Sequence, residues 1–454
     1  MRQSGITQGA GPKTFRVKSF GCQMNMYDGE RMAELLAARG MSPTPEGEEA
    51  ELVVLNTCHI RERSAEKVYS EIGRLRKAGG AHPPMVAVAG CVAQAEGEEI
   101  FARAPSVGVV VGPQSYHRLP ELVARAAAGE RAADTDMPAD AKFAALPKRR
   151  RSAPSAFLTV QEGCDKFCTY CVVPYTRGAE ISRPFSALMD EAERLVDAGA
   201  REVTLLGQNV NAWTGEDRRG RAIGLDGLIA ALDSLPQLHR IRYTTSHPND
   251  VTEGLIAAHG EVGKLMPYLH LPVQSGSNRV LKAMNRSHDG ESYLLLIERF
   301  RAVRPDIAIS GDFIVGFPGE SDAEFEETLR LVDAVGYAQA YSFKYSPRPG
   351  TPAAQMQGQI APEVMDERLQ RLQAALGRHS LAFNQASVGR RCTVLVERAG
   401  RRPGQWLGKS PWLQSVYFSG PGAAAVRIGD MVEVELAAAG PNSLEGRVLE
   451  LVPA

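Results

Sequence analysis

The chain has 454 residues, which is enough for two to four domains with hydrophobic cores that need no disulfide staples. Hydrophobic residues make up 44% and charged residues 23%, as is usual for a globular protein, and a net charge of −1 restricts any nucleic-acid site to a local basic patch. The first residues lack the apolar segment of a secretory signal, and no run of about 18 apolar residues occurs, so we expect a cytoplasmic protein without membrane spans.

The first region alternates short apolar runs with helical patterns that end at glycine. Buried strands are predicted at Thr14–Phe20, Glu51–Asn56, Met85–Gly90 and Val107–Gly112. This alternation predicts an α/β fold with a doubly wound parallel sheet over residues 14–131. The next stretch, 132–154, is rich in alanine, proline and charge and has no clean period, so it predicts a linker.

The second region, residues 155–384, holds six further strand–helix units. One helix is predicted to begin at a Ser186 cap, and another at Ser321, where Ser321 and Glu324 form a capping box. Six units fall short of the eight of a complete barrel, so we expect a partial, open α/β barrel. The last region, 385–454, has four short strands separated by Gly and Pro turns, which predicts a small β-barrel.

Three cysteines lie within eight residues, directly after the first strand of the second region. Cys164, Cys168 and Cys171 have the spacing C-x3-C-x2-C. Soft thiolates select zinc or iron–sulfur clusters, but structural zinc sites require four closed ligands. A [4Fe–4S] cluster takes one thiolate per iron, so three cysteines leave one iron open to a substrate or cofactor. The alternatives are a zinc site completed by a distant histidine, or three structural cysteines.

Three more cysteines each follow a predicted strand of the first region: Cys22, Cys58 and Cys91. The carboxyl ends of parallel strands meet at one edge, where open α/β sheets bind ligands. We therefore predict a second three-thiolate cluster there, although free cysteine is often a small core residue. Cys392 opens a strand of the last region and is assigned a structural or surface role.

The later triplet in the sequence, Cys164, Cys168 and Cys171, is called the second triplet, and Cys22, Cys58 and Cys91 the first. The second triplet, with Tyr170 before its last cysteine, resembles the signature of radical S-adenosylmethionine (SAM) enzymes. With the other motifs, the chain resembles the methylthiotransferase family over nearly its whole length after Lys13, and its tail looks like the RNA-binding TRAM barrel. The motifs that carry this resemblance are SFGCQMN, NTCHIRERSAEKV, AGCVAQ, QEGCDKFCTYCVVPYTRG, LLGQNVN, LHLPVQSGS, GDFIVGFPGES and YSPRPGTPAA.

The resemblance implies two clusters with different tasks. The one on the second triplet binds SAM and yields a 5′-deoxyadenosyl radical, which removes hydrogen from C2 of an adenine ring. The one on the first triplet presents sulfur to that carbon, and a second SAM supplies the methyl group. The chain is most similar to the branch that acts on N6-isopentenyladenosine beside the anticodon of tRNA. Other branches modify threonylcarbamoyl-adenosine of tRNA or an aspartate of a ribosomal protein.

Polar residues at strand ends of the partial barrel are candidates for holding SAM or substrate, although polar loops after strands are common. These candidates are Gln208, Asn209, Gln274, Ser275 and Asp312. Gly316 and Gly319 permit close backbone approach. A lone histidine is more often a hydrogen-bonded structural residue than a ligand, so His59, His247 and His270 are left out of the metal sites.

Basic residues crowd around aromatics in the last region. Cations hold phosphates and aromatics stack bases, so we predict an RNA-binding face. Its predicted members are Arg390, Arg391, Arg398, Arg401, Arg402, Lys409 and Trp406. The alternative is a solvated basic face over core aromatics. Lys148, Arg149, Arg150 and Arg151 of the linker are predicted to add phosphate contacts.

The expected partners follow from these sites and the resemblance. They are the tRNA anticodon stem-loop, an electron donor of the reductase or flavodoxin type, and a donor of sulfur or clusters. We expect a monomer without membrane contacts. The competing hypothesis from another class is a non-enzymatic iron–sulfur or zinc protein that binds RNA.

Overall fold

The computed structural model describes residues 11–45, 47–59, 62–80, 82–137, 141–149 and 153–452. They form two compact units. The first comprises Met1–Lys148, Glu162–Asp165 and Cys171–Ile181, and the second Arg149–Gln161, Lys166–Tyr170 and Ser182–Ala454. The N-terminal residues 1–10 and two of the predicted phosphate contacts, Arg150 and Arg151, lie outside the described residues.

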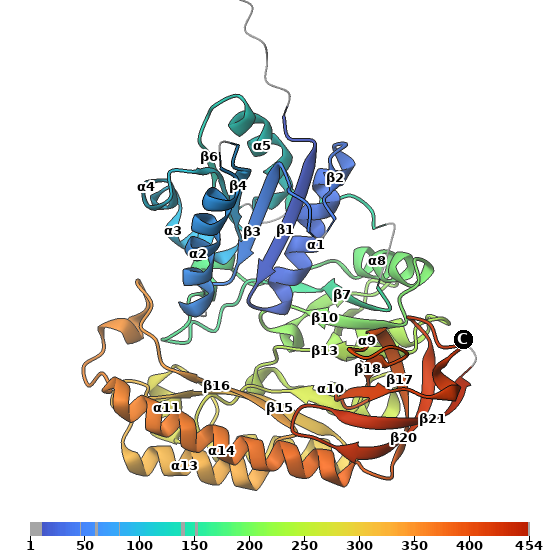
Figure 1. Cartoon of the computed structure of the whole chain (residues 1–454). Helices are drawn as coiled ribbons and strands as arrows, with labels where there is room; N and C mark the ends of the chain where they lie inside the picture. Colours follow the sequence, from blue (N-terminus) through green and yellow to red (C-terminus); the bar gives the residue numbers. More distant parts are fainter. Residues whose placement is uncertain are drawn as a thin grey trace, which may run out of the picture. The chain divides into compact units, whose positions relative to one another are not determined.

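A six-stranded parallel sheet forms the centre of the first unit, in the order β2-β1-β3-β4-β5-β6 (Figure 1). Its strands are β1 (Thr14–Phe20), β2 (Ser42–Pro43), β3 (Leu52–Thr57), β4 (Met85–Ala89), β5 (Val107–Val111) and β6 (Ala132–Asp134). The four predicted strands are confirmed. β2 and β6 are short edge strands that the sequence pattern did not predict. β6 lies within the stretch predicted to be a linker, and it forms a strand there because Ala132 packs into the core of the sheet.

Helices cover both faces of this sheet, which explains why its central strands are continuously apolar. Side chains of successive strand residues alternate between the faces: Leu52 joins the core under α1 and α5, and Val53 joins the core under α2, α3 and α4. The helices of the unit are α1 (Gln23–Ala38), α2 (Glu62–Ala78), α3 (Cys91–Glu96), α4 (Glu99–Arg103), α5 (Leu119–Ala127), α6 (Ala141–Ala145) and α7 (Val173–Arg177).

Six parallel strands in two sheets form the partial barrel of the second unit, as predicted. The sheet β13-β10-β7 meets the sheet β14-β15-β16 through a bridge between Ile241 and Leu265. The strands are β7 (Ser155–Thr159), β10 (Glu202–Leu206), β13 (Arg240–Tyr243), β14 (Tyr268–His270), β15 (Ala308–Val315) and β16 (Gln339–Lys344). Two two-stranded sheets add further strands. One pairs β8 (Gln161–Glu162) with β9 (Ile181–Ser182), and the other is the antiparallel pair of β11 (Thr214–Glu216) and β12 (Ala222–Gly224).

Helices pack around these strands, and α13 and α14 lie side by side next to β15 and β16 (Figure 1). They are α8 (Phe185–Asp197), α9 (Leu225–Asp233), α10 (Glu253–Glu261), α11 (Asn278–Ala283), α12 (Gly290–Val303), α13 (Asp322–Val335) and α14 (Pro362–Ala386). The predicted capping box of Ser321 and Glu324 is confirmed. The predicted Ser186 cap is wrong, because α8 begins at Phe185 after Pro184 and has no side-chain cap.

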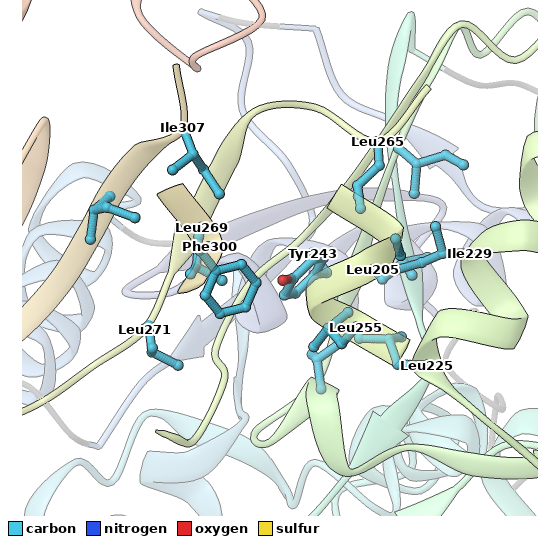
Figure 2. Close-up of a cluster of buried hydrophobic side chains, with 14 of the residues drawn as sticks. Leu205, Leu225, Ile229, Tyr243, Leu255, Leu265, Leu269, Leu271, Phe300 and Ile307 are labelled. Carbon is cyan, nitrogen blue, oxygen red and sulfur yellow. The ribbon is translucent and has the colours of Figure 1, made fainter. Parts of the chain in front are cut away.

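The largest hydrophobic core lies between the strands and helices of the barrel. Figure 2 shows Leu205 of β10, Tyr243 of β13 and Phe300 of α12 pointing into it. The Tyr243 hydroxyl lies 2.7 Å from Nε2 of His259, so the one polar atom of this ring is satisfied inside the core. None of the helices among the described residues carries an apolar run long enough to cross a membrane.

A closed five-stranded barrel ends the chain, in the order β17-β18-β19-β21-β20. Its strands are β17 (Arg391–Ala399), β18 (Trp406–Lys409), β19 (Ser415–Phe418), β20 (Met431–Ala439) and β21 (Leu444–Val452). The small β-barrel is confirmed, but β18 was not predicted. Gly408 interrupts the strand pattern in the sequence. Glycine is required at this position because a Cβ there would lie 2.1 Å from the carbonyl oxygen of Leu395.

Two buried arginines join the five-stranded barrel to the partial barrel. Arg240 donates to the carbonyl oxygens of Lys409 (2.8 Å) and Thr393 (2.6 Å). Arg242 donates to those of Pro411 (2.8 Å) and Ser410 (2.9 Å). Both arginines start from β13, so the interface is fixed by the strand framework and not by a flexible loop.

The Glu202 carboxylate is the counter-charge of both arginines. Its Oε2 accepts from Nε of Arg242 at 2.9 Å and lies 3.8 Å from Nη1 of Arg240. Burial opposes the charge of Glu202, but Arg242 and Arg240 hold the pKa of this carboxyl below its ordinary value. The triad is therefore charged and fully paired, as buried ions require.

We expect Glu202→Gln to lower the free energy of unfolding by about 3–5 kcal/mol, because it leaves two buried arginines without a counter-charge. Thermal melting measures this as a large fall in Tm. The matched control is Glu326→Gln, which removes an exposed partner of Arg371 and should cost less than about 1 kcal/mol. Equal melting of the two variants would contradict the structural role of the triad.

Candidate iron–sulfur sites

The first cysteine triplet lies at one edge of the parallel sheet. Cys22 follows β1, Cys58 follows β3 and Cys91 follows β4. Strand pairing aligns these ends, because Phe20 is opposite Thr57 and Asn56 is opposite Ala89. The predicted convergence of the three strand ends is therefore present.

The thiols of this triplet are close enough to interact. Cys22 and Cys58 are hydrogen-bonded, and Cys91 interacts electrostatically with Cys22. Gly21, with φ +112°, is required at this point, because a Cβ on it would lie 2.4 Å from the Cβ of Cys58. Glycine thus allows two strand ends to approach so closely that their thiols meet.

Polar groups around Cys22 favour its thiolate. The hydrogen bond with Cys58 lowers the pKa of the Cys22 thiol to about 6, helped by the nearby Arg177 and opposed by burial. Its Sγ also lies 3.0 Å from Oδ1 of Asn25, whose side chain is fixed by Asn56 through a 3.2 Å hydrogen bond. Thiolates are the form that binds metals, so this environment suits a metal ligand.

A buried charge network lies beside the same triplet, within the first unit. Arg177, the last residue of α7, donates to Oδ2 of Asp28 at 2.6 Å and lies 3.5 Å from Oε1 of Glu162. The helix α7 packs against α3, which begins at Cys91. Burial opposes the charge of Arg177, but Asp28 and Cys91 raise the pKa of the guanidinium well above its ordinary value.

Glu162 is held by further buried groups. Lys142 forms an ion pair with Oε2 of Glu162, and Nε2 of Gln114 donates to the same oxygen at 2.8 Å. Gln114 also donates to the carbonyl oxygen of Arg177 at 3.0 Å. Sequence reasoning missed this network. The signal for it was the presence of Glu162 and Arg177 inside the motif QEGCDKFCTYCVVPYTRG.

The two ends of the loop that carries the second triplet, at Cys164 and Cys171, contact residues of the first unit. Gly163 has φ +76°, and a Cβ there would lie 1.8 Å from the carbonyl oxygen of Ala179. The amide of Cys164 donates to the carbonyl oxygen of Gly178 at 3.3 Å, and the amide of Val173 lies 3.5 Å from Sγ of Cys171. Glycine is thus required directly before the first cysteine of the motif.

The middle of this loop, residues 166–170, is shaped by the second unit. Asn285 donates from Nδ2 to the carbonyl oxygens of Lys166 (3.1 Å) and Phe167 (3.0 Å). Phe167 and Asn285 both have positive φ, +47° and +58°, a strained conformation that tends to mark functional sites. Nη1 of Arg286 lies 3.7 Å from Sγ of Cys168. Sequence reasoning missed Asn285 and Arg286 as well.

Each donor set consists of three thiols, which suits a [4Fe–4S] cluster. Among the residues that the structure describes, no three His, Cys, Asp or Glu side chains meet closely enough to hold one metal ion. A [4Fe–4S] cluster binds each thiolate to a different iron, so its ligands need not meet at one point. The remaining cysteine, Cys392, is buried in the core of the five-stranded barrel, which agrees with its predicted structural role.

Four of the five candidates for holding SAM follow a strand of the partial barrel, whereas Asp312 lies within β15. The amides of Gln208 and Asn209 both donate to Oε1 of Gln161, at 2.9 and 3.0 Å, and Nδ2 of Asn209 donates to Asp250 at 2.7 Å. Gln274 is strained, with φ +78°.

The other two candidates differ in exposure. Asp312 of β15 is partly exposed and lies 3.6 Å from Nε2 of His270. Ser275 is fully buried, and its hydroxyl lies 3.3 Å from that of Thr328. Ser275 therefore packs against α13.

Three family models match the chain. They are described as Uncharacterized protein family UPF0004 over residues 14–112, Radical SAM superfamily over residues 158–332 and TRAM domain over residues 385–449. The tRNA-2-methylthio-N(6)-dimethylallyladenosine synthase of Novosphingobium aromaticivorans is 76% identical over 445 residues, which cover 98% of this chain and 99% of the relative. The chain belongs to this synthase family. The Erythrobacter litoralis member is 73% identical over 444 residues, with the same coverage.

Solved structures support the fold at much lower identity. The radical SAM methyltransferase TsrM from Kitasatospora setae gives a TM-score of 0.55 at 14% identity and covers 75% of this chain and 77% of its own. OxsB, a cobalamin-dependent SAM radical enzyme, gives 0.51 at 13% identity and covers 81% and 56%. As a member of the synthase family, the chain is a radical SAM enzyme that uses SAM and two [4Fe–4S] clusters.

The predicted RNA-binding residues of the five-stranded barrel divide into two groups by their exposure. Five arginines are exposed and make no ion pair with acidic residues in the described part of the chain: Arg390, Arg391, Arg398, Arg401 and Arg402. Lys409 and Trp406 are half-buried. Nζ of Lys409 donates to Ser415 at 2.9 Å, and the Trp406 indole donates to the carbonyl oxygen of Ala423 at 3.1 Å.

The basic residues of the predicted linker also differ from one another. Lys148 is exposed. Arg149 is buried in the second unit, where Nη1 donates to the carbonyl oxygen of Phe157 at 3.2 Å. Arg149 therefore serves as an anchor of β7.

We expect Asn285→Ala to reduce iron binding at the second triplet, because it removes both side-chain hydrogen bonds to the loop at Lys166 and Phe167. The measurement is iron per chain after anaerobic reconstitution, in a background with Cys22, Cys58 and Cys91 changed to alanine. The background should hold about four irons, and Asn285→Ala clearly fewer.

The matched control for this experiment is Asn278→Ala, which also removes two side-chain hydrogen bonds within the second unit, one to Glu291 (3.0 Å) and one from the amide of Gly290 (2.8 Å). It should keep the iron content of the background. If Asn285→Ala also keeps full iron content, the asparagine does not organise the cluster loop.

Proposed function

We propose that the chain converts N6-isopentenyladenosine beside the anticodon of tRNA into its 2-methylthio derivative. The observation that carries this proposal is the presence of two separate cysteine triplets in a chain 76% identical to a synthase of that name. A chain with one triplet would supply a radical but no second cluster from which sulfur could come.

The six cysteines are the proposed cluster ligands. Cys164, Cys168 and Cys171 hold the cluster that binds SAM, and Cys22, Cys58 and Cys91 hold the auxiliary cluster. When bound, SAM would supply the 5′-deoxyadenosyl radical and the methyl group, and the auxiliary cluster would supply the sulfur atom. The chain holds three thiolates at each site and leaves one position open to an outside ligand.

The polar groups at the barrel strand ends are proposed to orient SAM and substrate. The backbone amide of Asn209 is held by Gln161 and its side chain by Asp250, so both have fixed positions within the second unit. Gln208 and Gln274, which follow strands of the partial barrel, and Asp312, which lies within β15, complete the proposed set. Ser275, buried against α13, is assigned to positioning the loop that carries Gln274.

The exposed arginines of the five-stranded barrel are proposed to bind tRNA phosphates. Arg401 and Arg402 lie in the loop between β17 and β18, and Arg398 lies near the end of β17. Lys409 and Trp406 support the barrel itself, since both polar groups are bonded within it. The target base lies in a single-stranded loop, so turning it out costs less than flipping it from a duplex.

The remaining partners follow from what the reaction consumes. Reductive cleavage of SAM needs an electron, so we propose a donor of the reductase or flavodoxin type. Each turnover removes a sulfur atom, so we propose a protein that supplies sulfur or whole clusters. We further propose that the chain acts as a monomer in the cytoplasm, where thiols remain reduced.

The first test of this function is mass spectrometry of tRNA nucleosides from cells with and without the gene. We expect the 2-methylthio-isopentenyl nucleoside to disappear without the gene and its unthiolated precursor to accumulate. A gene copy with Cys91→Ala should not restore the product, whereas Cys392→Ala should restore it, because Cys392 lies in a separate core.

Other outcomes redirect the assignment. If the nucleoside is unchanged while threonylcarbamoyl-adenosine or a ribosomal protein loses its methylthio group, the substrate is wrong and the chemistry stands. Reconstituted protein with stoichiometric zinc and little iron would contradict the enzymatic function, since two clusters hold about eight irons.

We expect the double variant Arg401→Gln, Arg402→Gln to weaken tRNA binding and to reduce the slope of log affinity against log salt by about 2, because each arginine that binds a phosphate adds about 1 to this slope. Binding titrations at several salt concentrations measure both effects. Lys409→Gln is the matched control, since its side chain bonds Ser415, and it should change the slope by less than about 1. Equal slopes in all three proteins would exclude this loop as the RNA-binding element.

A further inference from the structure

We propose that Arg177 is a positioning residue of the auxiliary site, where it places a fixed positive charge beside the first cysteine triplet. The helix α7, which ends at Arg177, packs against α3, which begins at Cys91, and Arg177 is paired with Asp28 of α1, the helix that follows Cys22. The inference rests on the proposed function, because it takes Cys22, Cys58 and Cys91 as ligands of the auxiliary cluster. It adds a residue outside the six cysteines whose charge sets the properties of that cluster.

The position of Arg177 is fixed by two carboxylates. Its side chain is only 3% exposed, and Asp28 and Glu162 hold the guanidinium at 2.6 and 3.5 Å. Asp28 comes from α1, the same helix that begins directly after Cys22. A buried ion without partners costs several kcal/mol, so these contacts keep Arg177 both charged and in one place.

Glu162 and Arg177 both lie close in sequence to the second cysteine triplet. Glu162 stands two residues before Cys164, and Arg177 stands six residues after Cys171. Both therefore belong to the motif of the radical SAM triplet, although their contacts are with groups of the first unit. The stretch from Glu162 to Arg177, which contains all three cysteines of the radical SAM triplet, thus also supplies two charged groups of the first unit.

Charges and hydrogen bonds at the ligand sulfurs control the reduction potential of an iron–sulfur cluster. Reduction adds a negative charge, which the Arg177 cation stabilises and the Asp28 carboxylate destabilises. In a buried site with a low dielectric constant, both effects are strong. Arg177 should therefore raise the midpoint potential of the auxiliary cluster, and Asp28 should lower it.

The test uses the full chain with Cys164, Cys168 and Cys171 changed to alanine, so that only the auxiliary cluster remains. Redox titration followed by electron paramagnetic resonance measures the midpoint potential, and iron content is measured on the same samples. We expect Arg177→Gln to shift the potential to more negative values. Arg177→Lys should restore part of the shift, and Asp28→Asn should shift the potential in the opposite direction.

The opposite signs separate an electrostatic role from simple damage, because both variants disturb the same buried pair. The control is Arg183→Gln, which removes another buried arginine, paired with Glu191 at 2.7 Å in the second unit, and should leave the potential unchanged. If Arg177→Gln loses its iron, Asp28→Asn still decides the question.

Two results would overturn the proposal. One is an unchanged potential in Arg177→Gln with full iron content, and the other is a shift of the same sign in Arg177→Gln and Asp28→Asn. A parent protein that binds no iron would instead contradict the auxiliary cluster, and with it the proposed function. The two failures are therefore distinguishable.

Discussion

Parallel strands all end at the same edge of their sheet, and the organisation of the first unit depends on this constraint. Cys22, Cys58 and Cys91 are more than thirty residues apart in sequence, yet each needs only to follow its strand to reach a common site. No long loop has to be ordered to bring them together, so the entropy cost of building the site is already met by the sheet. Gly21 completes the arrangement by allowing the first two strand ends to touch.

Buried charges add a second layer of order. In the first unit, Asp28 and Glu162 hold Arg177, and in the second unit Glu202 holds Arg240 and Arg242. Each group carries its own counter-charges, so each acts as a fixed point within its unit. Such networks contribute little net stability, but they specify one arrangement, because any displacement leaves an uncompensated charge.

The sequence predicted the elements whose signal is local. Most strand positions and the capping box at Ser321 were readable, because each rests on spacing or on neighbouring residues, and the convergence of three strand ends at Cys22, Cys58 and Cys91 followed from the parallel sheet. The Ser186 cap failed because Pro184 begins the helix earlier. β2, β6 and β18 were missed because they are only two to four residues long and are stabilised by their neighbours in the sheet.

The rest of the candidate sites depends on distant partners. Arg177 and Asp28 are 149 residues apart, and Asn285 lies 118 residues from Phe167, so no local pattern could reveal either contact. The basic tail shows the same limit. Its charge was visible in the sequence, but only the structure separates the exposed Arg401 and Arg402 from Lys409, which is bonded inside the barrel.

The junction of the two barrels also has an evolutionary meaning. Arg240 and Arg242 recognise the carbonyl oxygens of Thr393, Lys409, Ser410 and Pro411, and every amino acid supplies such a carbonyl. The side chains of the C-terminal barrel are thus free to diverge without loss of the joint, provided that its strands keep their path. Selection for a different RNA can therefore alter the binding surface of this barrel while the catalytic barrel keeps the same two arginines and the same point of attachment.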